Sequence, residues 1–507
     1  MSTNQEFSPS GFGGRESFVR HFAITGLFGY RSISLDSDYA ATILIARNGA
    51  GKTTMLGALD AFLRCQFGRL ADMSFDRIEC RLRGLEETLV LEKNELDLFL
   101  ASIGEDLAVQ RVAKTYELDL ADVLFFVLWE FPILLGNQKD LMRHPVFYKV
   151  YQHTSNTYES TDKIFRSLSK STNKSGSPIL NLRDAVARAL SGIEIVYLPT
   201  YRRIELSLPE PDESRPYRRT PSIQARLGLT KRGLHAGDIQ FGLSDISARL
   251  KQLHQEIMSE SNQKYAEISA NIIDDLISGA FENQDPSLED RPTSDELSVF
   301  FERMKDTRND RYDYYGPYGR PNKIPDLSLI YTNNVPVNSK KFLTYFLGKL
   351  NRVIQKTRIT EKVVEDFVGN CNRYLSAEDP TTAREGIAIG DDKELRLNRA
   401  SLEVSVWSKL RDNEIPLDAL SSGEKQMISL FARLYLYPNK KLVLIDEPEL
   451  SLSLDWQRKI LPDILSASLC QQVIAITHSP FIFDNELDVF AKAIQVEISD
   501  TNSAREL

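Results

Sequence analysis

The sequence predicts an α/β fold in which a parallel sheet, covered by helices on both faces, is interrupted by a long, mainly helical insertion. Aliphatic strand segments alternate with helical patterns near both ends of the chain, and this alternation is typical of parallel sheets. Between them the alternation gives way to long amphipathic helices. With 507 residues, 42% hydrophobic and 26% charged, the chain can hold several globular units, or one unit with an insertion.

Composition divides the chain into four segments. Residues 1–16 are polar and rich in Gly and Ser, without the apolar core of a signal peptide, and we expect them to be disordered. Residues 17–205 are expected to form the N-terminal half of the α/β unit, with a helical segment at about 95–190. Residues 206–385 are interpreted as a linker plus the helical insertion, and residues 386–507 as the C-terminal half of the α/β unit.

Periodicity sets the expected elements of the two halves. In the N-terminal half we expect strands at 18–27, 33–35, 42–45, 75–82, 88–91 and 193–198, helical stretches at 95–135 and 140–168, and a loop at 169–177. In the C-terminal half we expect strands at 395–397, 402–406, 442–445 and 472–476, and helices from about 423 and over 454–465.

The insertion begins with a basic stretch at 206–238 that contains four prolines and predicts a loop. Helices are expected at 246–276 and 341–375, with an irregular stretch between them. The two helices are consistent with an antiparallel pair that projects from the α/β unit, and equally with a compact helical domain.

A glycine-rich loop, Ala46-Arg47-Asn48-Gly49-Ala50-Gly51-Lys52-Thr53-Thr54, joins the strand at 42–45 to the following helix. This Walker A pattern places backbone N–H groups around nucleotide phosphates at the start of a helix. Lys52 would contact the phosphates, and the Thr53 hydroxyl would bind Mg²⁺. Ala46 stands where the first glycine is usual, a substitution that the backbone tolerates at negative φ. The loop's nucleotide-binding candidates are Asn48, Gly49, Ala50, Gly51, Lys52, Thr53 and Thr54.

A second motif ends the aliphatic strand at 442–445 with Asp446-Glu447-Pro448. The strand would deliver both carboxylates to the sheet edge where α/β proteins bind ligands. As a Walker B motif, it gives Asp446 the role of a Mg²⁺ ligand and Glu447 that of the catalytic group that orients the attacking water.

Two further segments suit the γ-phosphate side of a nucleotide site. Ser421, Ser422, Gly423 and Glu424 match an ABC-type signature, although the same residues also make a good helix N-cap. His478 follows the strand at 472–476 in the position of a switch histidine with a catalytic role, and Asp455 lies where a D-loop aspartate is expected. The four motifs occur in the order of an ABC-type ATPase whose halves are split by the insertion.

Charge and cysteine content constrain the partners. With 62 basic and 71 acidic residues the net charge is −9, so no overall basic field attracts nucleic acid. Local basic segments at 215–232 and 308–323 leave direct nucleic-acid binding open, beside the interpretations as solvated loops or a protein interface. Four scattered cysteines indicate free thiols in a reducing cytoplasm, and no apolar run suggests a membrane span.

The ATPase motifs resemble those of the RecF-like and OLD-like (overcoming-lysogenization-defect) ATPases. The Walker B extension, residues 446–453, is similar to theirs, with Ser451 and Ser453 where many members have histidines. The segments 195–203 and 477–487 resemble the ATPase subunits of PARIS anti-phage systems, which we favour, and the PtuA ATPases of Septu and retron systems. The resemblance covers both ATPase halves and little of the insertion.

The resemblance implies that ATP lies between two protomers, with Ser422 and Gly423 supplied by the second one. A homodimer would be the smallest active unit, with a larger ring left open. Arg31 is by similarity a phosphate contact, although a surface charge is an equal interpretation. The implied function is an anti-phage ATPase that senses infection, through a phage-encoded trigger protein, and controls a toxic nuclease.

That nuclease is expected to be a separate partner, because the segment after His478 is too short for a Toprim domain. A Toprim-type nuclease is favoured, and an HNH nuclease is the alternative. The competing hypotheses are a DNA repair or chromosome-maintenance ATPase of the RecF-like type that acts directly on DNA, and a nucleotide-gated scaffold with very slow hydrolysis.

Overall fold

The computed structural model describes residues 14–45, 49–154, 157–173, 177–199, 243–279, 291–312, 328–331, 335–375, 393–416, 419–450 and 452–498. These residues form two compact units, the first from the chain up to Gln240 together with Asn439 onward, and the second from Phe241 to Pro438. Asn48, the loop at 206–238 and Ser451 lie outside the described residues, as do most of residues 1–16 and of the segment 308–323.

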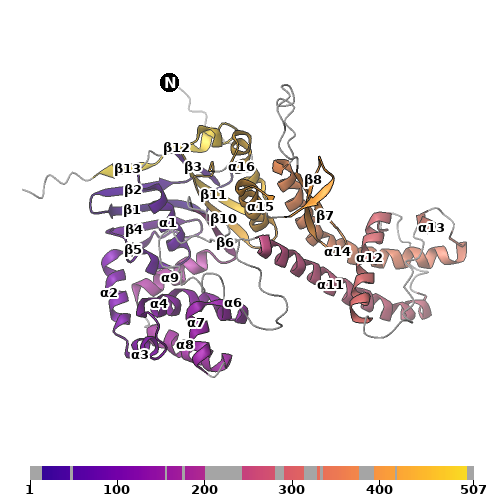
Figure 1. Ribbon diagram of the computed structural model, residues 1–507, viewed down its shortest axis with the longest axis horizontal. Helices are drawn as coiled ribbons and strands as arrows, with labels where there is room; N and C mark the ends of the chain where they lie inside the picture. The colour runs from indigo at the N-terminus through magenta and orange to yellow at the C-terminus, as the bar shows by residue number, and fades with distance from the viewer. Residues whose placement is uncertain are drawn as a thin grey trace, which may run out of the picture. The chain divides into compact units, whose positions relative to one another are not determined.

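A five-stranded sheet of parallel strands forms the centre of the first unit, and it confirms the predicted fold class (Figure 1). Its order is β12 (Ala491–Ala493), β3 (Ala41–Ile45), β11 (Cys470–Thr477), β10 (Lys440–Asp446) and β6 (Ile193–Leu198). All four neighbouring pairs are parallel. Strands buried on both faces read as continuous aliphatic runs, as in β10 and β11.

A second five-stranded sheet in this unit is antiparallel. Its order is β13 (Gln495–Ile498), β2 (Arg31–Asp36), β1 (Val19–Leu27), β4 (Arg77–Leu82) and β5 (Leu89–Glu92). The N-terminal strands were expected from the sequence, but β12 and β13 were not. The expected strands at 18–27 and 33–35 pair antiparallel as β1 and β2, and those at 75–82 and 88–91 as β4 and β5.

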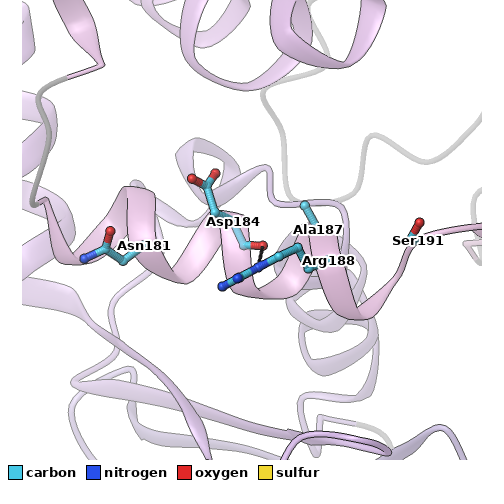
Figure 2. A pocket seen from close by; sticks show the side chains of 5 residues that line it. All are labelled: Asn181, Asp184, Ala187, Arg188 and Ser191. Atoms are coloured by element: carbon cyan, nitrogen blue, oxygen red, sulfur yellow. Dashed lines mark hydrogen bonds between the residues drawn. The ribbon is translucent and has the colours of Figure 1, made fainter.

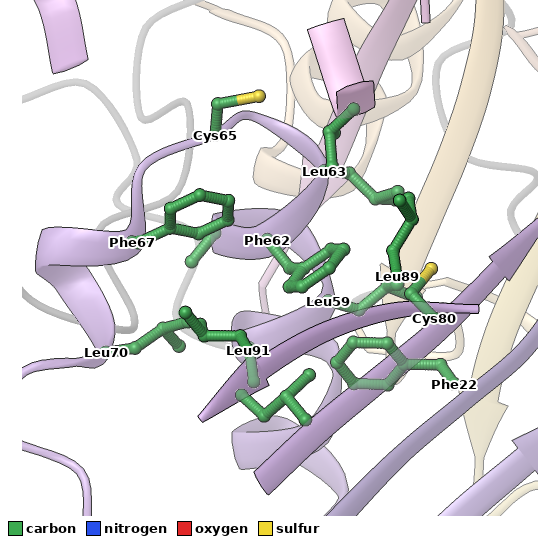
Figure 3. Packing of buried hydrophobic residues seen from close by; sticks show 14 of the residues in the cluster. Phe22, Leu59, Phe62, Leu63, Cys65, Phe67, Leu70, Cys80, Leu89 and Leu91 are labelled. Atoms are coloured by element: carbon green, nitrogen blue, oxygen red, sulfur yellow. The ribbon is translucent and has the colours of Figure 1, made fainter. Parts of the chain in front are cut away.

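Helix α1 (Lys52–Leu63) lies between the two sheets and is apolar around almost its whole circumference. Such a helix has to be buried on all sides. Phe62 contacts Phe22 of β1, and both side chains are completely buried. Figure 3 shows Leu59 and Phe62 of α1 packed against the side chains of the antiparallel strands. The core thereby fixes the helix that follows the glycine-rich loop.

Short helices form a lobe between β5 and β6. They are α2 (Lys93–Gly104), α3 (Leu107–Thr115), α4 (Leu120–Phe125), a π-helical turn η3 (Phe126–Glu130), α5 (Phe131–Leu134), α6 (Gln138–Arg143), α7 (Pro145–His153), α8 (Tyr158–Thr172) and α9 (Pro178–Ala189). An aromatic cluster of Phe126, Phe131, Phe147 and Phe165 holds the lobe together. The predicted loop at 169–177 is wrong for residues 169–172, which form the last turn of α8.

The second unit contains three long helices, α11 (Leu243–Ile277), α12 (Ser294–Tyr312) and α14 (Val337–Leu375), besides the short α13 (Ser328–Tyr331). Lys349 pairs with Asp275, and Lys356 pairs with Glu260, so α11 and α14 run antiparallel. Helix α12 packs Leu297 and Phe300 against Leu350 of α14. The prediction of an irregular stretch between the two helices is therefore wrong for Ser294–Tyr312, which form α12.

The other described residues of the second unit include a small antiparallel sheet and one helix. The sheet has the order β7 (Lys393–Leu397), β8 (Val404–Ser408) and β9 (Asn413–Ile415), and α15 (Ser422–Tyr435) follows it. The Asn372 side chain of α14 bonds to both the N–H and the C=O of Leu395 in β7. In the described ranges no helix is both long and apolar enough to cross a bilayer.

Gln472 of β11 connects the two sheets of the first unit. Its completely buried amide accepts hydrogen bonds from Phe18 N (2.9 Å) and Val19 N (2.7 Å). The same amide donates to Val19 O and to the Ser37 hydroxyl. One side chain therefore satisfies four buried polar groups at the start of β1 and the end of β2.

We expect Gln472→Leu to lower the free energy of unfolding by about 3 kcal/mol, because it leaves buried backbone groups without partners. Urea unfolding followed by circular dichroism measures the change. Gln471→Leu, on the same strand and partly exposed, is the matched control. A change within about 0.5 kcal/mol for Gln472→Leu would contradict this interpretation.

Candidate nucleotide-binding site

The predicted site residues of the first unit gather where three parallel strands end. In the strand register Asp446 is opposite Ile476, and Thr477 is opposite Ile45. The ends of β10, β11 and β3 therefore meet at one edge of the sheet, which is where α/β sheets bind ligands. This edge brings together the glycine-rich loop, the paired carboxylates and His478.

The closest link at this edge joins the two Walker motifs. The Thr53 hydroxyl donates a hydrogen bond of 2.6 Å to Oδ2 of Asp446, which is completely buried. A hydroxyl and a carboxylate are the hard oxygen donors that Mg²⁺ prefers, so the pair fits this ion. Among the described residues no group of three or more His, Cys, Asp or Glu could hold a metal by itself. Mg²⁺ needs few protein ligands where phosphates and water supply the others.

The glycine-rich loop is bounded by conformations that require glycine. Gly51 precedes α1 with φ +88°, and a Cβ there would lie 2.7 Å from Cδ1 of Ile33. Gly49 also has positive φ, and its carbonyl accepts a hydrogen bond of 2.7 Å from Arg31. Arg31 lies over the Tyr30 ring, 5.2 Å from its centroid. The predicted phosphate contact is therefore next to the loop, although its role stays a prediction.

Lys52 is almost fully buried, with 6% of its surface exposed. Burial lowers the pKa of its ammonium group, and the negative charges of Glu447 and Asp446 oppose that shift. Glu449 contributes a third opposing charge. The Lys52 ammonium therefore lies near three carboxylates, and the phosphate oxygens of a nucleotide would compete with these carboxylates for hydrogen bonds to it. Thr54, two residues further along α1, is partly buried.

Glu447 adopts a left-handed conformation with φ +52°, which costs a residue with a Cβ about 1–2 kcal/mol. Its backbone N–H donates to Ile476 O at 2.8 Å, so the pairing of β10 with β11 continues through this residue. The carboxylate Oε1 lies 3.9 Å from Nε2 of His478. Both side chains are partly exposed, so the predicted catalytic pair lies together at the open edge of the sheet.

Sequence reasoning missed two residues at this edge, Glu449 and Gln457. Glu449 accepts hydrogen bonds from Thr477 and from the backbone of His478 and Ser479. Gln457 of α16 (Leu454–Ser466) accepts one from the Ser479 hydroxyl. Glu449 belongs to the Walker B extension, residues 446–453, but a single sequence does not show which loop its carboxylate will contact. Asp455, the predicted D-loop residue, lies exposed in the first turn of α16.

The signature segment belongs to the second unit. Ser421 caps α15, its hydroxyl accepts from Glu424 N, and the Glu424 carboxylate accepts from Ser421 N at 2.6 Å. Lys393 of β7 holds the same carboxylate at 3.0 Å. The side chains of Ser421 and Glu424 thus cap the N-terminus of α15, and Ser422 and the buried Gly423 lie in its first turn. The N-cap interpretation is correct for Ser421, and a phosphate contact stays a prediction.

A hollow of about 860 Å³ lies along the polar face of α9 (Figure 2). Its described lining consists of Asn181, Asp184, Ala187, Arg188 and Ser191. None of the predicted nucleotide-binding residues belongs to that described lining.

Comparisons with known proteins match the C-terminal motifs. Residues 373–484 match a family described as "AAA domain, putative AbiEii toxin, Type IV TA system". This range contains the signature segment, Asp446, Glu447, Asp455 and His478. No curated protein matches the sequence.

Among solved structures, one match is titled "Crystal structure of the SmcHead bound to the C-winged helix domain of ScpA". It is 18% identical, with a TM-score of 0.20, and the match covers 32% of this chain and 48% of that chain. The present chain thus spans about half the length of that structure. Over residues 373–484, this chain is thus similar to AAA domains.

Proposed function

We propose that this protein is the ATPase subunit of a bacterial anti-phage defence system, and that it hydrolyses ATP bound between two copies of the chain. In this proposal it senses infection and sequesters or releases a separate toxic nuclease. The observation that carries the ATPase part is the 2.6 Å hydrogen bond between Thr53 and Asp446, which brings the two Walker motifs into one site.

Each residue at the sheet edge has its own role in the proposed hydrolysis. The N–H groups of the glycine-rich loop and the Lys52 ammonium bind the phosphates, and Thr53 and Asp446 hold Mg²⁺. When bound, Mg²⁺ supplies positive charge to the phosphate oxygens. Glu447 orients the attacking water and accepts its proton, and His478 stands 3.9 Å away to contact the γ-phosphate side.

The proposal of a shared site rests on the signature segment. Ser422 and Gly423 begin an α-helix of 14 residues, so their N–H groups suit an anion. By resemblance to the RecF-like and OLD-like ATPases, the signature residues in this proposal come from another protomer. ATP then favours the assembled state, since it binds both surfaces only there.

The defence role rests on resemblance. The Walker B extension and the segments 195–203 and 477–487 resemble the ATPases of PARIS systems. The matched family is described as a putative AbiEii toxin of a Type IV TA system, which supports a part in a toxic pathway. A Toprim-type nuclease is the favoured partner, an HNH nuclease is the alternative, and a phage-encoded protein is the proposed trigger.

The test combines turnover with partner capture. The purified protein should hydrolyse ATP with Mg²⁺, and tagged protein should retain a co-expressed Toprim-type nuclease encoded beside its gene. Binding of duplex DNA by the protein alone, dependent on ATP and weakened by salt, would instead favour the RecF-like DNA repair function. Tight ATP binding without turnover would overturn the ATPase part and favour a nucleotide-gated scaffold.

A further inference from the structure

Glu449 joins the two segments that carry the proposed catalytic pair. Its Oε2 accepts a hydrogen bond of 2.7 Å from the Thr477 hydroxyl. Its Oε1 accepts from His478 N at 2.8 Å and from Ser479 N at 3.2 Å. Three donors from the end of β11 therefore converge on one carboxylate from the segment after β10, and a charged acceptor makes such hydrogen bonds strong.

Gln457 provides a second connection between the same segments. Its side chain is 8% exposed, and its Oε1 accepts a hydrogen bond of 2.7 Å from the Ser479 hydroxyl. Its Nε2 donates to Leu452 O at 3.1 Å and to Glu449 O at 3.5 Å. The segment that leads from β10 to Asp455 is thus bound to the residues that flank His478.

We propose that Glu449 is a positioning residue that holds the backbone of His478 so that its imidazole stays beside Glu447. The N–H that Glu449 binds belongs to His478 itself, and that imidazole lies 3.9 Å from the Glu447 carboxylate. A loop that carries a reacting group loses rate when it shifts by about 1 Å. This inference rests on the proposed ATPase function.

The hydrogen bonds argue against a direct catalytic role for Glu449. Both carboxylate oxygens already accept from residues of the β11 segment, and Thr53 bonds to Asp446 instead. Glu449 therefore acts through His478. Its charge also lies close enough to Lys52 to oppose the lowering of that pKa by burial.

Glu449→Met tests the proposal with little change in side-chain length. The thioether is at most a weak acceptor, so the three hydrogen bonds to the carboxylate are lost. We expect kcat for ATP hydrolysis to fall about 10- to 100-fold, with KM for ATP nearly unchanged. Glu486→Met, at an exposed glutamate in the segment after His478, is the matched control and should keep wild-type turnover.

A double-mutant cycle separates positioning from a general structural defect. If Glu449 acts through His478, Glu449→Met should lower kcat in the wild-type background and have almost no further effect in the His478→Ala background. An equal fold-loss in both backgrounds would overturn the proposal.

Amide hydrogen exchange gives a readout that needs no turnover. In Glu449→Met the peptide that contains His478 and Ser479 should exchange about tenfold faster, because two backbone N–H groups lose their acceptor. Unchanged exchange would overturn the proposal even if the wild type is an active ATPase. Faster exchange in a protein whose wild type lacks turnover would keep the hydrogen bonds but overturn the proposed function, and the catalytic purpose of Glu449 with it.

Discussion

Glu447→Gln should abolish steady-state ATP hydrolysis while leaving ATP binding intact. The amide cannot take a proton from the attacking water, and loss of a general base lowers rates by about 10²- to 10⁴-fold. Because the proposed site closes around ATP between two protomers, the unhydrolysed nucleotide should hold them together. Phosphate release measures turnover, and size-exclusion chromatography with light scattering measures the oligomer with and without ATP.

Wild-type turnover in Glu447→Gln would remove this residue from its catalytic role. A variant that is inactive but does not shift toward a larger species with ATP would contradict the shared site instead. Glu486→Gln should behave as the wild type in both measurements, since its side chain is exposed and lies outside the candidate site.

Lys52→Met should remove nucleotide binding and not only hydrolysis. The buried ammonium stands among carboxylates at the start of α1, where phosphate oxygens would otherwise meet only negative side chains and N–H groups. A hydrogen bond between a charged donor and phosphate contributes about 1.5–3 kcal/mol, so the Kd for ATP should rise about 10- to 100-fold or more. Titration with a fluorescent ATP analogue measures the change.

Lys459→Met provides the control for Lys52→Met, because Lys459 is exposed on α16. Unaltered ATP affinity in Lys52→Met would place the nucleotide elsewhere. Together the two active-site variants separate binding from chemistry: Lys52→Met should lose ATP, and Glu447→Gln should retain it.

The local signals in the sequence were strong enough to predict the centre of the first unit. The strand β3, the glycine-rich loop and α1 occur in consecutive order, and β10 is a buried aliphatic run that ends in two carboxylates. Parallel pairing then brings Thr53 to Asp446 without any further information from side chains. The fold class and the meeting of the Walker motifs could therefore be predicted.

The elements that were missed depend on distant partners. Strands β12 and β13 are three and four residues long, and they form only by addition to β3 and β2. Helix α12 has few apolar residues, and they form a core only when they pack against α11 and α14. Glu449 is a similar case on a smaller scale, because its three donors come from a strand that lies next to β10 only in the folded sheet.

Strand β11 lies between β3 and β10, so its length determines where His478 lies relative to the glycine-rich loop and Asp446. Thr477 ends this strand opposite Ile45, one residue before the glycine-rich loop, while Ile476 stands opposite Asp446. Removing or adding one residue in β11 would exchange its two buried faces and draw His478 along the strand axis by about 3.3 Å. Natural variation among homologues of this chain should therefore change the composition of β11 far more readily than its number of residues.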